Sequence, residues 1–228
     1  MGAGSVARVG DVACSAYPRR VIFMMPKPNP TVLRLEANQI PEAGRVLARA
    51  FRTDPLQTYI FPDVDESVRR SPAMFSAIVR SGFERAEVWT TTSTAGIAVW
   101  SPPARRGPEE AKQDDAKEDR LPELMGHAAF ERLSSFFAAI ERFHVEAAPE
   151  PHWYLEILGV DPASQGQGIG SALLQPILDR ADADGVACYL ETVNAKNVPF
   201  YVARGFAVVL DTIEPGSGLR LWTFIRDP

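Results

Sequence analysis

The fold is decided by residues 153–174, WYLEILGVDPASQGQGIGSALL. Residues 153–160 form a mostly apolar run, which predicts a buried strand. A turn at Asp161-Pro162 leads into a loop with Gly166, Gly168 and Gly170, and an amphipathic helix follows. Glycines free the backbone so that successive N–H groups can converge on one anion, and the positive end of the next helix strengthens the attraction. The stretch therefore predicts a pyrophosphate-binding loop between a strand and a helix.

The elements on both sides of this stretch predict an α/β (α+β) protein. Upstream, the patterns predict a strand at 31–37, helices at about 41–53 and 66–86 with Phe83 buried, and a hairpin of strands at 87–92 and 96–100. A further amphipathic helix spans 130–144, with Phe137 and His144 on its buried face. Downstream, we expect a helix at 171–183, a strand at 187–193, a helix at 197–206, and strands at 207–213 and 219–225. The expected architecture is a mixed sheet with hairpins and one strand–helix–strand crossover.

The composition is that of an ordinary globular chain and excludes several classes of protein. The 228 residues are 46% apolar, and a net charge of −5 argues against a protein whose main task is to bind nucleic acid. Cys14 and Cys188 stand far apart, without the spacing of a disulfide framework or a zinc ribbon, which fits a reducing cytoplasm. No apolar run approaches the roughly 20 residues that a membrane span requires.

Two segments differ from the rest in composition. Residues 1–30 are basic and proline-rich, and we expect a flexible N-terminal extension there. Residues 105–120, RRGPEEAKQDDAKEDR, contain no large apolar side chain, so we expect a mobile charged insert at about 104–121. The remaining chain, 31–228, is expected to form one domain around that insert.

Two other phosphate-binding motifs fit the glycine-rich loop poorly. A dinucleotide-binding fingerprint requires GxGxxG, but Ser171 stands where the third glycine belongs. Glu191, about 20 residues further on, is the one feature that would suit that fingerprint. A Walker loop requires Gly-Lys-Ser/Thr, which the chain lacks.

The run 165–170, QGQGIG, matches the Q/RxxGxG/A signature of the GNAT superfamily of acyl-CoA N-acyltransferases, which the sequence resembles from about residue 31 onward. The NxxxxxxY element of that family matches Asn194 to Tyr201. Members that resemble puromycin N-acetyltransferase also share LET at 190–192 and N-x-P-F-Y-x-x-x-G-F at 197–206. A lone QxxGxG would be weak, whereas the two elements at this distance are specific.

The resemblance implies a GNAT fold, with a mixed, mostly antiparallel sheet that is splayed between the strands at 153–160 and 187–193 and flanked by helices. The pantetheine arm of acetyl-CoA would lie in the gap, with its pyrophosphate on the loop. Backbone donors near Leu158 and Val160 would polarise the thioester carbonyl. The candidate cofactor-binding residues are Leu158, Val160, Gln165, Gly166, Gln167, Gly168, Ile169, Gly170, Ser171 and Asn194.

Acetyl transfer to an amine requires a base that deprotonates the ammonium and benefits from an acid that protonates the departing thiolate. The resemblance assigns the acid to Tyr201. Glu156 is a base candidate because it interrupts an apolar strand, on the same face as Tyr154 and Leu158 by strand periodicity. Glu191 matches a glutamate of the puromycin acetyltransferase-like members and is the rival base. Both remain candidates.

The acceptor site is less defined. Asp54 lies in the loop between the first two helices, which covers the acceptor in the family, so it is a candidate for binding a cationic amine; alternatively, it caps the turn at Pro55. No two histidines show metal-ligand spacing, and we expect no metal.

Together these patterns predict an N-acetyltransferase that moves an acetyl group from acetyl-CoA to a primary amine of a small molecule by direct sequential transfer. A non-catalytic acyl-CoA-binding sensor and an enzyme that acetylates peptide or protein amines are the alternatives. We expect no nucleic-acid or membrane partner, and pairing into a homodimer stays open.

Overall fold

The computed structural model describes residues 1, 30–103 and 120–228. Most of the extension predicted over 1–30, and of the insert predicted at about 104–121, lies outside these residues. In the described chain, the strands form one seven-stranded sheet in the order β1-β2-β3-β4-β5-β7-β6. The strands are β1 Val32–Arg34, β2 Glu87–Thr91, β3 Gly96–Ser101, β4 Trp153–Val160, β5 Cys188–Thr192, β6 Ala207–Ile213 and β7 Arg220–Arg226.

Neighbouring strands are antiparallel, except that β4 and β5 run parallel. This arrangement confirms the predicted mixed, mostly antiparallel sheet, its hairpin of β2 and β3, and the crossover from β4 to β5. The crossover includes a helix because parallel strands require a long connection.

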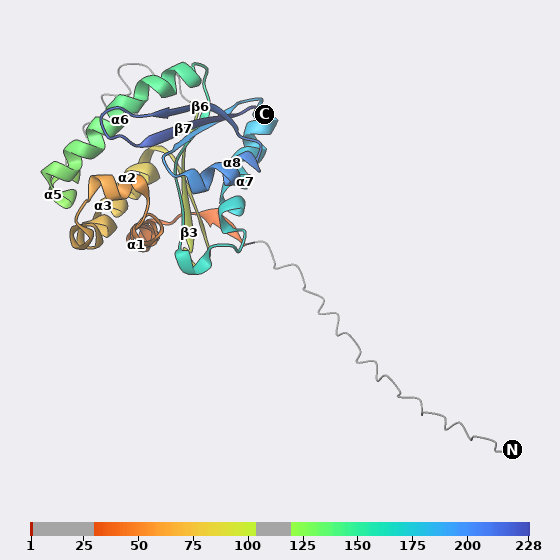
Figure 1. The fold of residues 1–228 in the computed structure, drawn as a ribbon, viewed down its shortest axis with the longest axis horizontal. Coiled ribbons are helices and arrows are strands. Elements are labelled where there is room, and N and C mark those ends of the chain that lie inside the picture. Colours follow the sequence, from red (N-terminus) through yellow and green to blue (C-terminus); the bar gives the residue numbers. More distant parts are fainter. Residues whose placement is uncertain (2–29, 104–119) are drawn as a thin grey trace.

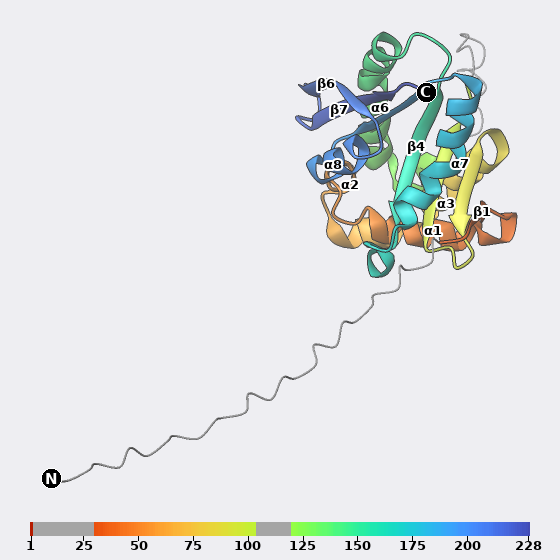
Figure 2. The same cartoon turned by 90° about the vertical axis from the view of Figure 1, so that its right-hand side faces the viewer.

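Helices cover both faces of the sheet. They are α1 Ile40–Ala50, α2 Pro55–Ile60, α3 Val64–Arg85, α5 Leu121–Met125, α6 His127–Ala147, α7 Ile169–Asp184 and α8 Val198–Val202. Strand periodicity divides the core: Ile97 and Val99 of β3 pack with α1 and α3, whereas Trp100 packs with α7 on the other face. Figures 1 and 2 show α1 and α3 on one side of the strands and α7 on the other. None of these helices is long and apolar enough to cross a lipid bilayer.

The sheet opens between β4 and β5. These strands pair only from Trp153 with Cys188 to Leu155 with Leu190, and the remaining residues of β4 have no partner on β5. The predicted splay is therefore present, and it begins at Leu155. Beyond that point one edge of β4 faces a gap instead of a neighbouring strand.

A bulge in β4 determines which backbone groups face that gap. Val99 pairs with Ile157 and Trp100 with Leu155, so Glu156 is an extra residue in β4. Beyond the bulge, the amide of Asp161 donates to the carbonyl of Ala95, on the β3 side, at 2.9 Å. Because antiparallel pairing alternates along a strand, the N–H groups of Leu158 and Val160 point the other way, into the gap.

Three expectations about the helices differ from the structure. Phe83 is 40% exposed because α3 packs closely at the neighbouring Gly82, where a β-carbon would lie 2.8 Å from the side chain of Val99. Phe137 is 45% exposed, and its neighbour Phe136 is buried instead, in a cluster with Ile140. The short helix α2 was not predicted, because six residues are too few to show a helical period.

Candidate functional site

The glycine-rich loop is shaped by two left-handed residues. Gly166 and Gly168 have φ angles of 71° and 81°, and a β-carbon at either position would meet no atom within 4 Å. Glycine is therefore favoured here by the backbone conformation and not by a lack of space for a side chain. Gly168 is the N-cap of α7, so the loop ends at a helix N-terminus. Such a combination of turned backbone and helix terminus suits an anion.

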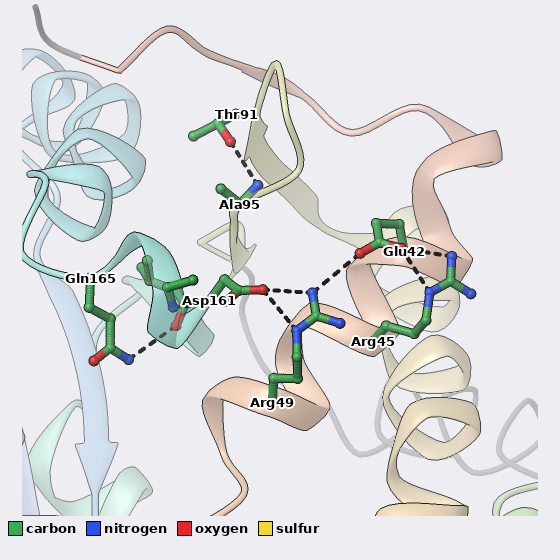
Figure 3. A network of polar contacts seen from close by, with 9 residues as sticks. Glu42, Arg45, Arg49, Thr91, Ala95, Asp161 and Gln165 are labelled. Atoms are coloured by element: carbon green, nitrogen blue, oxygen red, sulfur yellow. Dashed lines mark hydrogen bonds and ion pairs between the residues drawn. The ribbon is translucent and has the colours of Figure 1, made fainter.

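An ion-pair network fixes the start of this loop to α1 (Figure 3). Asp161 accepts hydrogen bonds from the backbone amide of Ala163 at 3.0 Å and from Nε of Arg49 at 2.8 Å. Arg49 also contacts Glu42 at 3.3 Å. Although burial opposes it, these two donors lower the pKa of Asp161. At the other end, the side chain of Gln165 donates to the carbonyl of Val160 at 3.1 Å, which holds the loop against β4.

A cleft of about 770 Å³ lies beside the loop. Most of the predicted cofactor-binding residues line it: Leu158, Val160, Gln165, Gly166, Gly168, Ile169, Gly170, Ser171 and Asn194. Gln167 is not part of the lining, and its side chain turns back to donate to the carbonyl of Ala163 at 3.5 Å. The open backbone of the loop, its helix terminus and the volume of the cleft fit the pyrophosphate and pantetheine of an acyl-CoA.

Two basic residues of the cleft were missed in the sequence. Lys196 and Arg204 both line it. The guanidinium of Arg204 donates to the hydroxyl of Ser171 and to the carbonyl of Phe200, and lies 3.5 Å from the centre of the Phe200 ring. The available signal was their position: Lys196 lies within the NxxxxxxY element, and Arg204 stands three residues after its end. Positive charge beside the loop suits a phosphate-bearing ligand.

A second, smaller cavity of about 110 Å³ lies where β4 and β5 separate. Three carboxylates line it, those of Asp54, Glu156 and Glu191. Apolar side chains from α2, α6 and β7 complete the wall: Leu56, Phe136, Phe137, Ile140 and Leu221. The fold thus brings together acidic residues that lie far apart in the sequence.

Tyr201 belongs to the walls of both cavities. Its residue is only 6% exposed, and its ring packs against Phe206 and Phe224. Burial, and then the charge of Asp54, raise the pKa of Tyr201 above its ordinary value. The phenol therefore keeps its proton at neutral pH, at the junction of the two cavities.

Glu156 is held in an ion pair. Its two carboxylate oxygens accept from Nη1 and Nη2 of Arg85, on α3, at 2.6 and 2.9 Å, and one of them also accepts from the hydroxyl of Ser101. The prediction that Glu156 shares a face with Leu158 is wrong, because the bulge at Glu156 reverses the alternation beyond it. Leu158 packs with the α7 cluster on the opposite face.

Glu191 lies deeper than Glu156. Its side chain is 9% exposed, and Oε1 is 3.7 Å from Nδ1 of His144, on α6. Tyr154 forms a hydrogen bond with the same carboxylate. The pKa of Tyr154 is raised, first by burial, then by the charges of Glu191 and Glu156 and by this hydrogen bond. Glu191 therefore lies between the cavity and a cluster of aromatic and imidazole side chains.

Asp54 and Asn194 form a bridge over the site. Asp54 caps α2 by accepting from the amide of Leu56 at 3.0 Å, and its other oxygen accepts from Nδ2 of Asn194 at 3.2 Å. Burial raises the pKa of Asp54. Asn194 also accepts from the amide of Lys196 at 3.2 Å, so it caps the next turn as well as lining the cleft. In the described part of the chain, no group of three or more His, Cys, Asp or Glu residues is placed to hold a metal ion.

The comparison with family models agrees with this geometry. Residues 83–206 match the model of the acetyltransferase (GNAT) family. An uncharacterized N-acetyltransferase from Schizosaccharomyces pombe is 28% identical over 179 residues, which cover 76% of this chain and 72% of that protein.

Solved structures share the fold. "Histone acetyltransferase HPA2 and related acetyltransferase" from Corynebacterium glutamicum has a TM-score of 0.62 and 24% identity, and the match covers 88% of this chain and 97% of that one. Arylalkylamine N-acetyltransferase 2 from Aedes aegypti also has a TM-score of 0.62, with 11% identity over 87% of this chain and 99% of the other. At these identities the likeness concerns the fold alone.

Proposed function

We propose that this chain, which belongs to the acetyltransferase (GNAT) family and is an acetyl-CoA-dependent N-acetyltransferase, acetylates a primary amine of a small molecule by direct transfer. The observation that carries the proposal is the junction at Tyr201, where a large cleft beside an anion-binding loop meets a small acidic cavity. A donor in the cleft and an amine in the cavity would meet at that residue.

The donor side of the reaction uses backbone groups. The turned loop at Gly166 and Gly168 and the N-terminus of α7 would hold the pyrophosphate, with Lys196 and Arg204 supplying positive charge nearby. The N–H groups of Leu158 and Val160 point into the gap, where they would stabilise negative charge on the thioester carbonyl during attack. These donors are fixed by the sheet, so little reorganisation is needed.

Glu191 is the better base of the two candidates. Both carboxylate oxygens of Glu156 accept hydrogen bonds from Arg85, and one also accepts from Ser101, so neither oxygen is open to the acceptor alone. Glu191 lines the same cavity from a more deeply buried position, next to His144. Its carboxylate would take a proton from the ammonium of the acceptor, and the free amine would then attack the acetyl carbon.

Tyr201 serves as the acid. When the tetrahedral intermediate collapses, the C–S bond breaks and the departing thiolate gains the phenolic proton. The attacking nitrogen loses its surplus proton as the amide forms, and this proton restores the phenol of Tyr201. Position supports this role more than acidity does: Tyr201 lies in the walls of both cavities, whereas its raised pKa keeps the phenol protonated but makes it a weaker acid.

The lining of the small cavity supports a compact cationic amine with an apolar body. Its carboxylates attract the ammonium form, and Leu56, Phe136 and Ile140 offer apolar contact. The restricted volume favours a small molecule over a peptide or protein amine. A non-catalytic acyl-CoA sensor would have no use for a base and an acid facing the same cavity.

Titration calorimetry with acetyl-CoA tests the donor assignment, with NADH as the control ligand. We expect acetyl-CoA to bind with a micromolar Kd and NADH not to bind. A panel of amines, read by release of free thiol, then tests the acceptor class. Failure to bind acetyl-CoA would overturn the donor site and every role assigned to its residues.

The variant Tyr201→Phe tests the acid. It keeps the ring packing but removes the phenolic proton, so kcat should fall by about 100-fold while the Kd for acetyl-CoA stays within about twofold. Equal losses in kcat and in affinity would contradict this assignment.

A further inference from the structure

A pair of histidines lies next to Glu191 and lines neither cavity. His144 of α6 is 2% exposed, and its Nε2 is 2.8 Å from Nε2 of His152, which precedes β4. His152 is half-buried, and its Nδ1 is 2.7 Å from the carbonyl oxygen of Glu150 in an exposed hydrogen bond. The pair thus leads from a buried carboxylate to the surface.

The hydrogen bonds give this chain a direction. A carbonyl oxygen only accepts, so Nδ1 of His152 must donate to Glu150, and Nε2 of neutral His152 is then an acceptor. His144 therefore donates from Nε2 to His152, which turns its Nδ1 toward Glu191 at 3.7 Å. The two hydrogen bonds are thus oriented so that a proton can pass from His144 to the surface, and the acceptor nitrogen of His144 lies 3.7 Å from Glu191 at the inner end.

Surrounding rings hold His144 in this orientation. It stacks on Tyr189 with ring centres 4.1 Å apart and meets the edge of Tyr154 at 4.6 Å. The titratable groups that face it are Tyr154 and His152 from the β4 side, and Tyr189 and Glu191 from β5. Glu156, which acts on Tyr154, is paired with Arg85.

We propose that His144 and His152 form a proton relay that carries the proton taken up by Glu191 out to solvent. The relay rests on the proposed function of Glu191 as base. The base must lose its proton before the next turnover. Glu191 is only 9% exposed, so it cannot pass that proton directly to bulk water while the acceptor fills the cavity.

The proton balance is simple. The ammonium N–H bond breaks, and its proton binds the carboxylate of Glu191. That proton moves to Nδ1 of His144 while the proton on Nε2 of His144 moves to Nε2 of His152. His152 then carries two ring protons and loses one to water at the surface. Glu191 is again a carboxylate and His144 is again neutral, with its proton on Nδ1. After the product leaves, water enters the cavity: a proton from surface water binds His152, the proton on Nε2 of His152 moves to Nε2 of His144, and the proton on Nδ1 of His144 leaves through Glu191 to the cavity water, which resets both rings without net proton transfer.

The variants His152→Gln and His144→Gln test the relay, because an amide can hydrogen-bond but cannot carry a proton onward. His127→Gln is the matched control: it is the remaining histidine of the chain and lies exposed at the first turn of α6. In weak buffer, we expect both test variants to lose at least roughly tenfold in kcat, with unchanged Kd for acetyl-CoA. Added imidazole should restore much of the activity of His152→Gln, since a mobile base can replace one at the surface.

Two outcomes would overturn the relay alone. Wild-type kcat and pH profile in His152→Gln, in weak buffer, would show that no proton needs that path. Ring ¹⁵N spectra provide a readout without turnover: His144 and His152 should titrate together and respond to Glu191→Gln, whereas His127 should not. Independent titration of the two rings would contradict the hydrogen-bonded chain. Absence of turnover by the wild-type protein with every amine would instead contradict the proposed function, and the relay with it.

Discussion

Glu156 and Glu191 line the same cavity, and substituting each by glutamine should separate a structural carboxylate from a chemical one. Glu191→Gln removes the carboxylate that we propose accepts the proton of the ammonium. General bases contribute about 100- to 10,000-fold, so kcat should fall by at least about 100-fold. Because an amide can keep hydrogen bonds to neighbouring groups, we expect the melting temperature to change little.

Glu156→Gln should have the opposite profile. This substitution removes the ion pair that both oxygens of Glu156 form with Arg85. The side chain of Glu156 is 14% exposed, and that of Arg85 is 32% exposed. Hydrogen bonds to charged groups contribute about 1.5 to 3 kcal/mol when buried, and exposed ion pairs about 0 to 1 kcal/mol. For this intermediate exposure we expect a loss of about 1 to 2 kcal/mol in the free energy of unfolding, and a drop of about 2 to 8 °C in Tm. The effect on kcat should stay below about tenfold.

The assay combines thermal unfolding with thiol release at saturating acetyl-CoA. Glu87→Gln is the matched control, because Glu87 pairs with Arg34 and Arg180 at 2.5 and 2.6 Å and lines neither cavity. It should lower Tm without changing kcat. Loss of turnover in Glu156→Gln, combined with near-normal turnover in Glu191→Gln, would refute the assignment of the base.

Two further predictions concern the glycine-rich loop. Gly168→Ala should weaken acetyl-CoA binding by about 5- to 30-fold, because alanine at a φ of 81° costs about 1 to 2 kcal/mol even though the space around it is open. Gly168→Asn should weaken binding less, because asparagine tolerates that conformation. Calorimetry that shows equal affinity for the two variants would contradict this prediction. Asp161→Asn should reduce stability at neutral pH by about 0.5 to 1 kcal/mol, and the difference from wild type should vanish in acid. The sign follows from the lowered pKa: the carboxylate of Asp161 stabilises the fold above its ordinary value of 3.8, and that contribution is lost as the pH falls through the lower value of the folded state. Denaturant unfolding from neutral pH to acid tests it, and a constant difference would contradict the role of the Arg49 pair.

Patterns that act over a few residues were readable in the sequence. The spacing of Gly166 and Gly168 predicted a turned loop before a helix, and both glycines adopt the left-handed conformation that only glycine takes easily. The apolar runs predicted the strands of the sheet, and the two family motifs predicted the splay between β4 and β5. The errors at Phe83 and Phe137 arose because a helical period leaves the position of the buried face uncertain by one residue, and only packing against the sheet resolves it.

The roles of the two glutamates could not be read in the same way. Their sequence contexts were similar, each a carboxylate in an apolar strand, and both stayed candidates for the base. The difference lies in partners that are distant along the chain: Arg85 reaches Glu156 from α3, and His144 approaches Glu191 from α6. The bulge that reverses the faces of β4 beyond Glu156 is likewise a property of its pairing with β3.

The sequence by itself thus determined the family of fold, the glycine-rich loop before a helix and the set of candidate residues, because these depend on local conformation and short-range periodicity. Only the tertiary structure decided that Glu156 is tied in an ion pair with Arg85, that Glu191 lies deeper in the same cavity, and that two histidines lie between Glu191 and the surface. Those outcomes depend on the free energy of contacts between elements many residues apart, and no local pattern encodes them.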